Sequence, residues 1–422
     1  MRGVIWLVLL FLVAVVAATT LGSNDGLVSI YWGGWRTDLS LNLFVLVLLG
    51  SCLVLMSAVQ TLNTLLSLPQ RAGAWRALRR ERAAQSALRE ALAEYFAARY
   101  GRARTAAQRA LQIAADTPGL KDDSEFIVLG QLLAAGSLHR LQDRVRRDET
   151  LQTATRTARS AKGAAALRAG ARTAEEAARL LGAEWALEDR DAPRALEALE
   201  ALPPGAARRT HALRLKLQAL RMARRPLEAL HTAHLLANHQ AFSPVVAQSL
   251  LRSLAAESMD ATHDDQQLRR LWGQFDAADR RDPAVASRAA LRAVQLGAAE
   301  DARQWLRPFW ERLSELARED RELVSLALIE ARAGIGGDWL PRLESAVQAY
   351  GHESAVVAAV GMVFAERQLW GKARRLLETA AAAPTLTART RRAAWRQLAM
   401  LARQDGDEAR AVECEQAAAA LD

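Results

Sequence analysis

Three histidines lie close together in the stretch LHTAHLLANHQ, as His231, His234 and His239. A spacing of three residues places His231 and His234 on one face of a helix, where two imidazoles could ligate a haem iron or another metal ion. Ala233 and Leu236 belong to the predicted buried stripe of this helix, so the two histidines are expected to point away from its helical partner. Because no other ligand type is nearby, we favour exposed polar histidines at a helix end over haem ligation, and we predict no metal site.

The rest of the sequence offers no catalytic set. It contains no His-Glu-x-x-His motif, phosphate-binding loop, Gly-x-Ser-x-Gly elbow or kinase signature. Its acidic residues are expected on solvated helix faces or as partners of arginine four residues away. Cys52 lies in an apolar run and Cys414 near the end of the chain, which gives neither a disulfide framework nor a Cys-x-x-Cys site. We therefore predict a protein without enzymatic activity.

Two apolar segments near the N-terminus are long enough to cross a membrane. The first covers residues 4–21 and the second about 39–60, with a short loop at 22–38 between them. At 1.5 Å per residue each can span a hydrocarbon core of about 30 Å. The loop carries Tyr31, Trp32 and Trp35, whose amphipathic rings favour the membrane interface. These features predict a membrane anchor in residues 1–70.

Arginine placement predicts the orientation of this anchor. Five arginines follow the second segment closely, whereas the loop contains Arg36 alone. Positively charged flanks stay in the cytoplasm, so both chain termini are predicted to be cytoplasmic and the loop periplasmic, in a bacterial inner membrane. A cleaved signal peptide is the alternative for the first segment, and the second would then still hold the C-terminal part in the cytoplasm.

Basic charge is concentrated after the anchor. Residues 71–109 carry a net charge of +7 and residues 140–172 a net charge of +6, against +9 for the whole chain. A basic stretch beside a membrane is attracted to anionic lipid, while the alternative is a topogenic signal on a solvated helix. Nucleic-acid binding is not expected, because no recognition motif accompanies the charge. The predicted lipid-facing basic collar consists of Arg71, Arg76, Arg79, Arg80 and Arg82.

Beyond the anchor, apolar residues recur at helical spacing between short Gly, Pro and Asp breaks. The stretch from Val357 to Pro384 resembles a tetratricopeptide unit, a helix–turn–helix pair of about 34 residues with small residues where the helices touch. Weaker copies precede it, and residues 137–178 fit the pattern poorly. The predicted repeat-packing residues are Gly361, Phe364, Trp370, Ala373, Leu377, Trp395 and Leu398.

These patterns predict an all-α fold: a two-helix transmembrane hairpin followed by an α-solenoid of tetratricopeptide-like repeats. The predicted divisions are an anchor at residues 1–70, a basic juxtamembrane helical segment at 71–110 and a repeat domain at 111–422.

The N-terminal part resembles one family in particular. The loop sequence Gly26-Leu27-Val28-Ser29-Ile30-Tyr31 and the entry Asp38-Leu39-Ser40-Leu41 into the second segment resemble the HemY family of proteobacterial inner-membrane proteins. The resemblance implies an association with haem biosynthesis, as a scaffold or regulator that touches late-pathway enzymes, and haem or a porphyrin as a ligand.

Together, the residues and the resemblance favour a membrane-tethered adaptor, in which stacked helix pairs hold a protein partner at the inner membrane. The alternative is a general envelope-assembly or quality-control adaptor that is not tied to haem.

Overall fold

The computed structural model describes residues 26–160 and 165–421. The predicted first span, residues 4–21, lies outside the described residues. The chain divides into two compact units, Met1–Ala171 and Arg172–Asp422.

The described part of the first unit begins with a β-hairpin. Strands β1 (Leu27–Trp32) and β2 (Trp35–Ser40) pair in antiparallel register, with Leu27 opposite Ser40. Gly33 and Gly34 form the turn with positive φ angles of 55° and 90°, which matches the two-residue turn that follows the twist of paired strands. The segment predicted as a short loop at 22–38 therefore contains a β-hairpin, whereas the regular elements of the rest of the described chain are helical, as the all-α prediction states.

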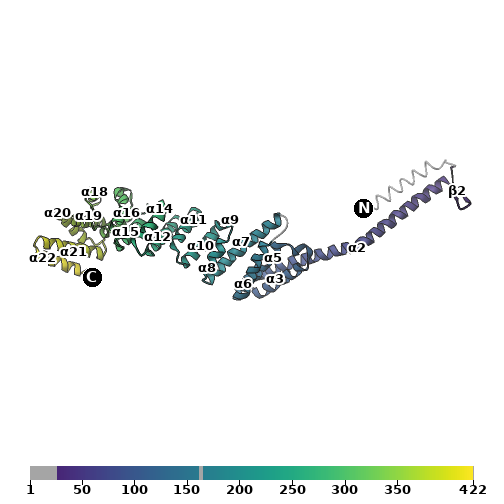
Figure 1. The fold of residues 1–422 in the computed structure, drawn as a ribbon, viewed down its shortest axis with the longest axis horizontal. Coiled ribbons are helices and arrows are strands. Elements are labelled where there is room, and N and C mark those ends of the chain that lie inside the picture. The colour runs from purple at the N-terminus through teal and green to yellow at the C-terminus, as the bar shows by residue number, and fades with distance from the viewer. Residues whose placement is uncertain (1–25, 161–164, 422) are drawn as a thin grey trace. The chain divides into compact units, whose positions relative to one another are not determined.

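Helix α2 (Leu41–Phe96) follows the hairpin directly and runs for 56 residues (Figure 1). The Ser40 hydroxyl accepts a hydrogen bond from the Leu43 amide at 3.4 Å and so caps the helix. Among the described residues, one helical segment, Leu41–Leu62, has the length and apolar composition of a membrane span. It starts and ends within two residues of the predicted second span. No break in α2 marks the predicted division at residue 70.

The rest of the first unit is a helical stack on the C-terminal half of α2. The helix α3 packs on α2, α5 packs on α3, and α6 packs on α5. Alanine side chains dominate these contacts, and their small size lets the helix backbones approach closely. The elements after α2 are α3 (Tyr100–Ala115), α4 (Pro118–Lys121), α5 (Ser124–Arg140) and α6 (Arg144–Arg159).

The second unit consists of paired helices. Its elements are α7 (Ala165–Glu188, which begins in the first unit), α8 (Ala192–Glu200), α9 (Pro204–Ala207), α10 (Thr210–Met222), α11 (Pro226–Asn238), α12 (Pro244–Asp260), α13 (Asp265–Gln274), α14 (Ala277–Arg280), α15 (Pro283–Gln295), α16 (Ala299–Glu311), η1 (Leu313–Glu315), α17 (Arg318–Glu330), η2 (Gly337–Trp339), α18 (Leu340–Tyr350), α19 (Ser354–Glu366), α20 (Trp370–Ala382), α21 (Ala388–Gln404) and α22 (Glu408–Ala419).

These helices form two rows, as expected for an α-solenoid. Helices α12, α15, α17, α19 and α21 contact one another in succession, and α11, α13, α16, α18 and α20 each contact the next helix of that row. Counting from α10, the first helices of the pairs begin at residues 210, 244, 283, 318, 354 and 388, which are 34, 39, 35, 36 and 34 residues apart. The tetratricopeptide unit repeats about every 34 residues. The second unit is therefore a helical-repeat solenoid.

A recurrent turn joins the two helices of several pairs. Arg224, Gln368 and Gly406 each stand second after a helix end and have φ angles of 54°, 59° and 77°. The residue after each of them donates its amide to the carbonyl five positions back, as Leu369 does to Phe364 at 2.8 Å. This is the Schellman motif, which closes a helix with one residue in the left-handed region.

The predicted repeat-packing residues lie in this solenoid, on α19, α20 and α21. Phe364, Ala373, Leu377 and Leu398 are buried, while Trp370 and Trp395 are partly buried against the same core. A Cβ atom added to Gly361 would lie 3.0 Å from the Cβ of Leu376. The missing side chain of Gly361 is therefore what allows α19 and α20 to touch.

Candidate functional sites

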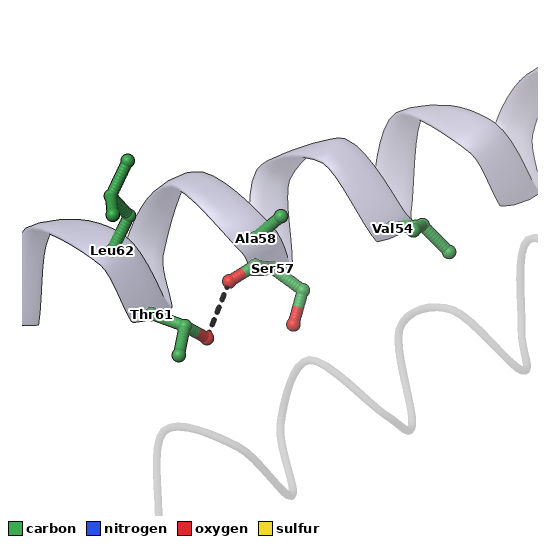
Figure 2. Close-up of a pocket in the computed structure, with 5 residues that line it drawn as sticks. All are labelled: Val54, Ser57, Ala58, Thr61 and Leu62. Atoms are coloured by element: carbon green, nitrogen blue, oxygen red, sulfur yellow. Dashed lines mark hydrogen bonds between the residues drawn. The ribbon is translucent and has the colours of Figure 1, made fainter. Parts of the chain in front are cut away.

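No residue of the apolar segment Leu41–Leu62 of α2 is buried, and most of its side chains are exposed. Figure 2 shows part of this surface, where Ser57 and Thr61 stand beside apolar side chains. The Thr61 hydroxyl donates to the Ser57 carbonyl at 2.7 Å, and the Ser51 hydroxyl donates to the Leu48 carbonyl at 2.8 Å. These bonds within the helix satisfy the hydroxyl donors where a membrane would supply no water.

The basic collar continues from this segment along α2. Arg76, Arg79, Arg80 and Arg82 are exposed, and the side chain of Arg71 lies outside the description. The Arg79 guanidinium carbon lies 5.5 Å from the centre of the Trp75 ring, within range of a cation–π contact. Arg76 follows Leu62 by 14 residues, which is about 21 Å along a helix. The structure thus fixes the distance between the span and the collar along α2.

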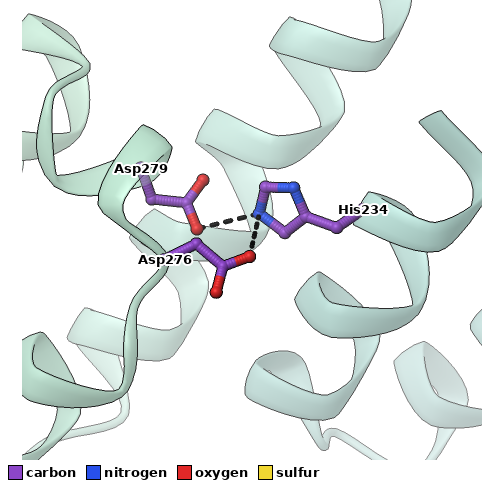
Figure 3. A group of neighbouring side chains, drawn as sticks. All are labelled: His234, Asp276 and Asp279. Carbon is purple, nitrogen blue, oxygen red and sulfur yellow. Dashed lines mark hydrogen bonds and ion pairs between the residues drawn. The ribbon is translucent and has the colours of Figure 1, made fainter. Parts of the chain in front are cut away.

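The three histidines of the predicted haem-binding stretch lie in different environments on α11 and at its end. His231 and His239 are exposed, whereas the His234 side chain is only 18% accessible. His234 Nε2 lies 2.8 Å from Asp279 Oδ2 and 4.0 Å from Asp276 Oδ2 (Figure 3). The structure therefore brings His234 together with two carboxylates. His231, its predicted partner, does not share this environment.

The local fold explains how this cluster is positioned. Helix α11 buries Ala229, Leu230, Ala233 and Leu236 in the core of the solenoid. Thr232, which the sequence pattern did not place inside, is also buried, so the buried face is broader than the predicted stripe. The face that carries His234 reaches the short helix α14, which lies between the second helix of one pair and the first helix of the next.

The electrostatics of the cluster favour a charged imidazole. Asp279 is only 5% exposed, and burying a carboxylate is costly unless an opposite charge or a hydrogen bond compensates it. The hydrogen bond to Asp279 raises the pKa of His234 above its ordinary value, against the opposing effect of partial burial. Asp276 is the N-cap residue of α14, yet its side chain makes no capping hydrogen bond. Its carboxylate is turned toward His234 instead, as Figure 3 shows.

One imidazole nitrogen and two carboxylate oxygens therefore converge. The three atoms lie within 4.8 Å of one another. Nitrogen and oxygen donors of this kind suit divalent transition metals such as Zn²⁺ and Mn²⁺. The sequence pattern pointed to His234 but missed both aspartates, which follow it by 42 and 45 residues. No local signal marked Asp276 and Asp279 beyond their position beside a helix start.

Residues 26–122 match the family model described as the HemY protein N-terminus. No curated protein matches the chain. A solved structure titled "Structure of Naa15/Naa10 bound to HypK-THB" aligns over 78% of this chain at 12% identity and a TM-score of 0.22. The alignment spans 56% of the length of that solved chain.

The described residues define a helical-repeat protein with an exposed apolar helix of membrane-spanning length near its N-terminus. Its N-terminal region, residues 26–122, carries the domain that the model of the HemY protein N-terminus describes. The family match covers the β-hairpin, the whole of α2, α3 and α4. It confirms the resemblance that the sequence of the hairpin and the start of α2 indicated.

Proposed function

We propose that this chain is a membrane-anchored adaptor that holds protein partners of haem biosynthesis at the cytoplasmic face of the bacterial inner membrane. The observation that carries the proposal is that an exposed apolar helix and a stack of helix pairs occur in one chain. The first supports anchoring and the second supports protein binding. The family match at residues 26–122 supports the link to haem biosynthesis.

Protein binding is the role that the solenoid supports best. Stacked helix pairs present an extended surface for a protein partner. Each pair contributes side chains to that surface, and no single enclosed pocket is required. Several apolar side chains remain exposed on this unit, including Val245 at 77% and Val412 at 48%. We propose late enzymes of the haem pathway as the partners and no enzymatic activity for the chain itself.

The anchor is proposed to have two spans, residues 4–21 and Leu41–Leu62, with the β-hairpin between them in the periplasm. Tyr31, Trp32 and Trp35 of the hairpin are between 72% and 84% exposed, as interfacial aromatic residues would be. The arginines that follow Leu62 keep the solenoid in the cytoplasm. Cleavage of the first span would leave this orientation unchanged.

We propose that contact between the basic collar and lipid depends on the tilt of α2 relative to the membrane. If α2 stood upright, Arg76 would lie about 21 Å beyond the hydrocarbon core, while the headgroup layer is only about 7 Å thick and charges are screened over about 8 Å. From Arg76 onward the collar therefore reaches anionic lipid when α2 leans toward the membrane surface, whereas Arg71, about 14 Å beyond Leu62 along the helix, lies within reach of it in either posture. The same arginines act as a topogenic signal in either posture.

We also propose haem or a porphyrin as a ligand, which the match to the HemY N-terminus favours. If His231 and His234 ligate iron together, His234 must leave Asp279 or bind through its other ring nitrogen. Reconstitution of the detergent-solubilised chain with haem tests this role, because axial ligation by histidine shifts and sharpens the Soret absorption band of free haem. An unchanged band in the double variant His231→Ala/His234→Ala would exclude these residues as ligands.

Photocrosslinking of the full-length chain in cells tests the adaptor role. A photoreactive amino acid is placed at Val245 or Val412 in the solenoid, and at Trp32 in the hairpin as the control site. We expect enzymes of tetrapyrrole synthesis to be captured from the solenoid positions and not from Trp32. Capture from Trp32 alone would contradict binding by the solenoid. Capture of envelope-assembly proteins in place of tetrapyrrole enzymes would favour the alternative adaptor role.

A further inference from the structure

We propose that His234, Asp276 and Asp279 form a binding site for a divalent transition-metal ion that joins two neighbouring helix pairs of the solenoid. The proposal stands on the convergence of one ring nitrogen and two carboxylate oxygens from separate elements (Figure 3). His234 comes from α11, and both aspartates come from the connection between α13 and α15. The proposed metal site does not depend on the proposed adaptor function.

The ligand types fit Zn²⁺ or Mn²⁺. An imidazole with two carboxylates supplies three protein ligands, and a water molecule would complete a tetrahedral zinc site. Asp276 is 61% exposed, so this side of the cluster is open to water. Alkaline-earth ions are less well matched, because they take oxygen ligands in larger numbers.

The two distances from His234 Nε2 need only a small adjustment. Tetrahedral ligands at about 2.1 Å from a zinc ion are about 3.4 Å from one another. The Nε2–Oδ2 separation of 2.8 Å to Asp279 would open slightly, and that of 4.0 Å to Asp276 would close by a similar amount. Asp276 can make this movement because it is exposed and forms no side-chain cap with α14.

Charge also favours a cation at this point. Two carboxylates face a single imidazole, and the more buried of them, Asp279, gains most from an additional positive charge. The ion would displace the proton from His234 Nε2 into solvent, and bonds from the metal to Nε2 and to both aspartates would replace the His234–Asp279 hydrogen bond. It would also fasten α11 to the connection that precedes α15, and binding only to the folded chain would stabilise the solenoid.

The simpler alternative is an ion pair between His234 and Asp279 with no metal affinity. Zinc titration of the full-length, detergent-solubilised chain distinguishes the two, after any affinity tag has been cleaved off and bound metal removed with a chelator. Isothermal calorimetry measures the stoichiometry and the affinity. Cobalt substitution gives visible absorption bands that report the coordination geometry.

Three variants make this titration specific. His234→Ala removes the nitrogen ligand, Asp276→Asn removes the exposed carboxylate without disturbing the core, and His231→Ala removes an exposed histidine from the same helix as the matched control. We expect one zinc ion per chain for the wild type and for His231→Ala. We expect at least tenfold weaker binding for His234→Ala and for Asp276→Asn.

Thermal unfolding provides a second readout. Zinc should raise the unfolding temperature of the wild type and of His231→Ala, and should raise that of Asp276→Asn much less. Circular dichroism confirms that Asp276→Asn is folded before it is titrated. Absence of saturable one-to-one binding in the wild type would overturn the proposal in favour of the ion pair. Equal zinc affinities of the wild type and Asp276→Asn would overturn it as well.

Discussion

Arg321 Nε lies 3.1 Å and 3.0 Å from the two carboxylate oxygens of Glu353, so that one guanidinium joins helix α17 to the residue just before helix α19. The same guanidinium lies over the Tyr350 ring, with its carbon 4.4 Å from the ring centre, and also donates to the Leu316 carbonyl. Glu353 is only 5% exposed. This ion pair therefore ties two successive helix pairs together where water screens it least.

Glu353→Gln should destabilise the solenoid clearly. The substitution leaves Arg321 largely buried without its counter-charge, and breaking a buried pair in this way costs about 3 kcal/mol. The matched control is Glu344→Gln, which breaks the exposed pair with Lys372 and should cost less than about 1 kcal/mol. Denaturant unfolding of the solubilised chain measures both. Equal losses of unfolding free energy in Glu353→Gln and Glu344→Gln would show that burial does not strengthen the Arg321–Glu353 ion pair.

The contribution of Glu353 should also depend on pH. Its hydrogen bond with Arg321 lowers the pKa of the Glu353 carboxyl below the ordinary value of 4.5. A lowered pKa in the folded state adds stability that is complete above pH 4.5 and is lost as the pH falls through the folded-state pKa. The stability difference between the wild type and Glu353→Gln should thus be constant from pH 5.5 to 7 and shrink in more acidic solution. Unfolding curves at several pH values test this, and a difference that grows in acid would refute it.

Gly361→Ala should weaken the contact between α19 and α20. The added Cβ would lie 3.0 Å from the Leu376 Cβ and 3.2 Å from Leu377 side-chain atoms, so the helices must separate or these leucines must shift. Overpacking of this kind costs about 1–3 kcal/mol. Gly371→Ala on α20 is the control, because no atom lies within 4 Å of its added Cβ, and it should be neutral or slightly stabilising. Thermal unfolding of both variants measures the contrast, and a Gly361→Ala protein as stable as the wild type would argue against close packing here.

The sequence predicted the turns between helix pairs better than the turns within them. Ser243-Pro244 and Asp282-Pro283 are breaks of the Pro and Asp kind, and each begins the first helix of a new pair. The turns within pairs often use residues such as Arg224 or Gln368 in the left-handed region, where glycine is the usual signal. Tertiary packing holds Arg224 and Gln368 in the left-handed region, and the residue types in the sequence do not reveal that packing.

The hairpin and the metal-type cluster were missed for different reasons. The turn Gly33-Gly34 between β-prone residues was a readable hairpin signal, but the segment was assigned as a loop because of its place between two apolar stretches. The partners of His234 gave no comparable signal. Asp276 and Asp279 reach His234 only because the solenoid stacks one helix pair on the next. The pattern of residues along the chain does not reveal that tertiary contact.

Cysteine labelling should reveal the orientation of the anchor. In a background with Cys52→Ser and Cys414→Ala, single cysteines are introduced as Trp32→Cys in the hairpin and Val245→Cys in the solenoid, at side chains that are 84% and 77% exposed. A membrane-impermeant maleimide applied to intact spheroplasts should label the hairpin cysteine and leave the solenoid cysteine unlabelled, because the arginines after Leu62 hold the solenoid inside. After lysis both should react, which shows that each cysteine is accessible. Labelling of Val245→Cys in intact spheroplasts would reverse the proposed topology, and with it the cytoplasmic location of any partner.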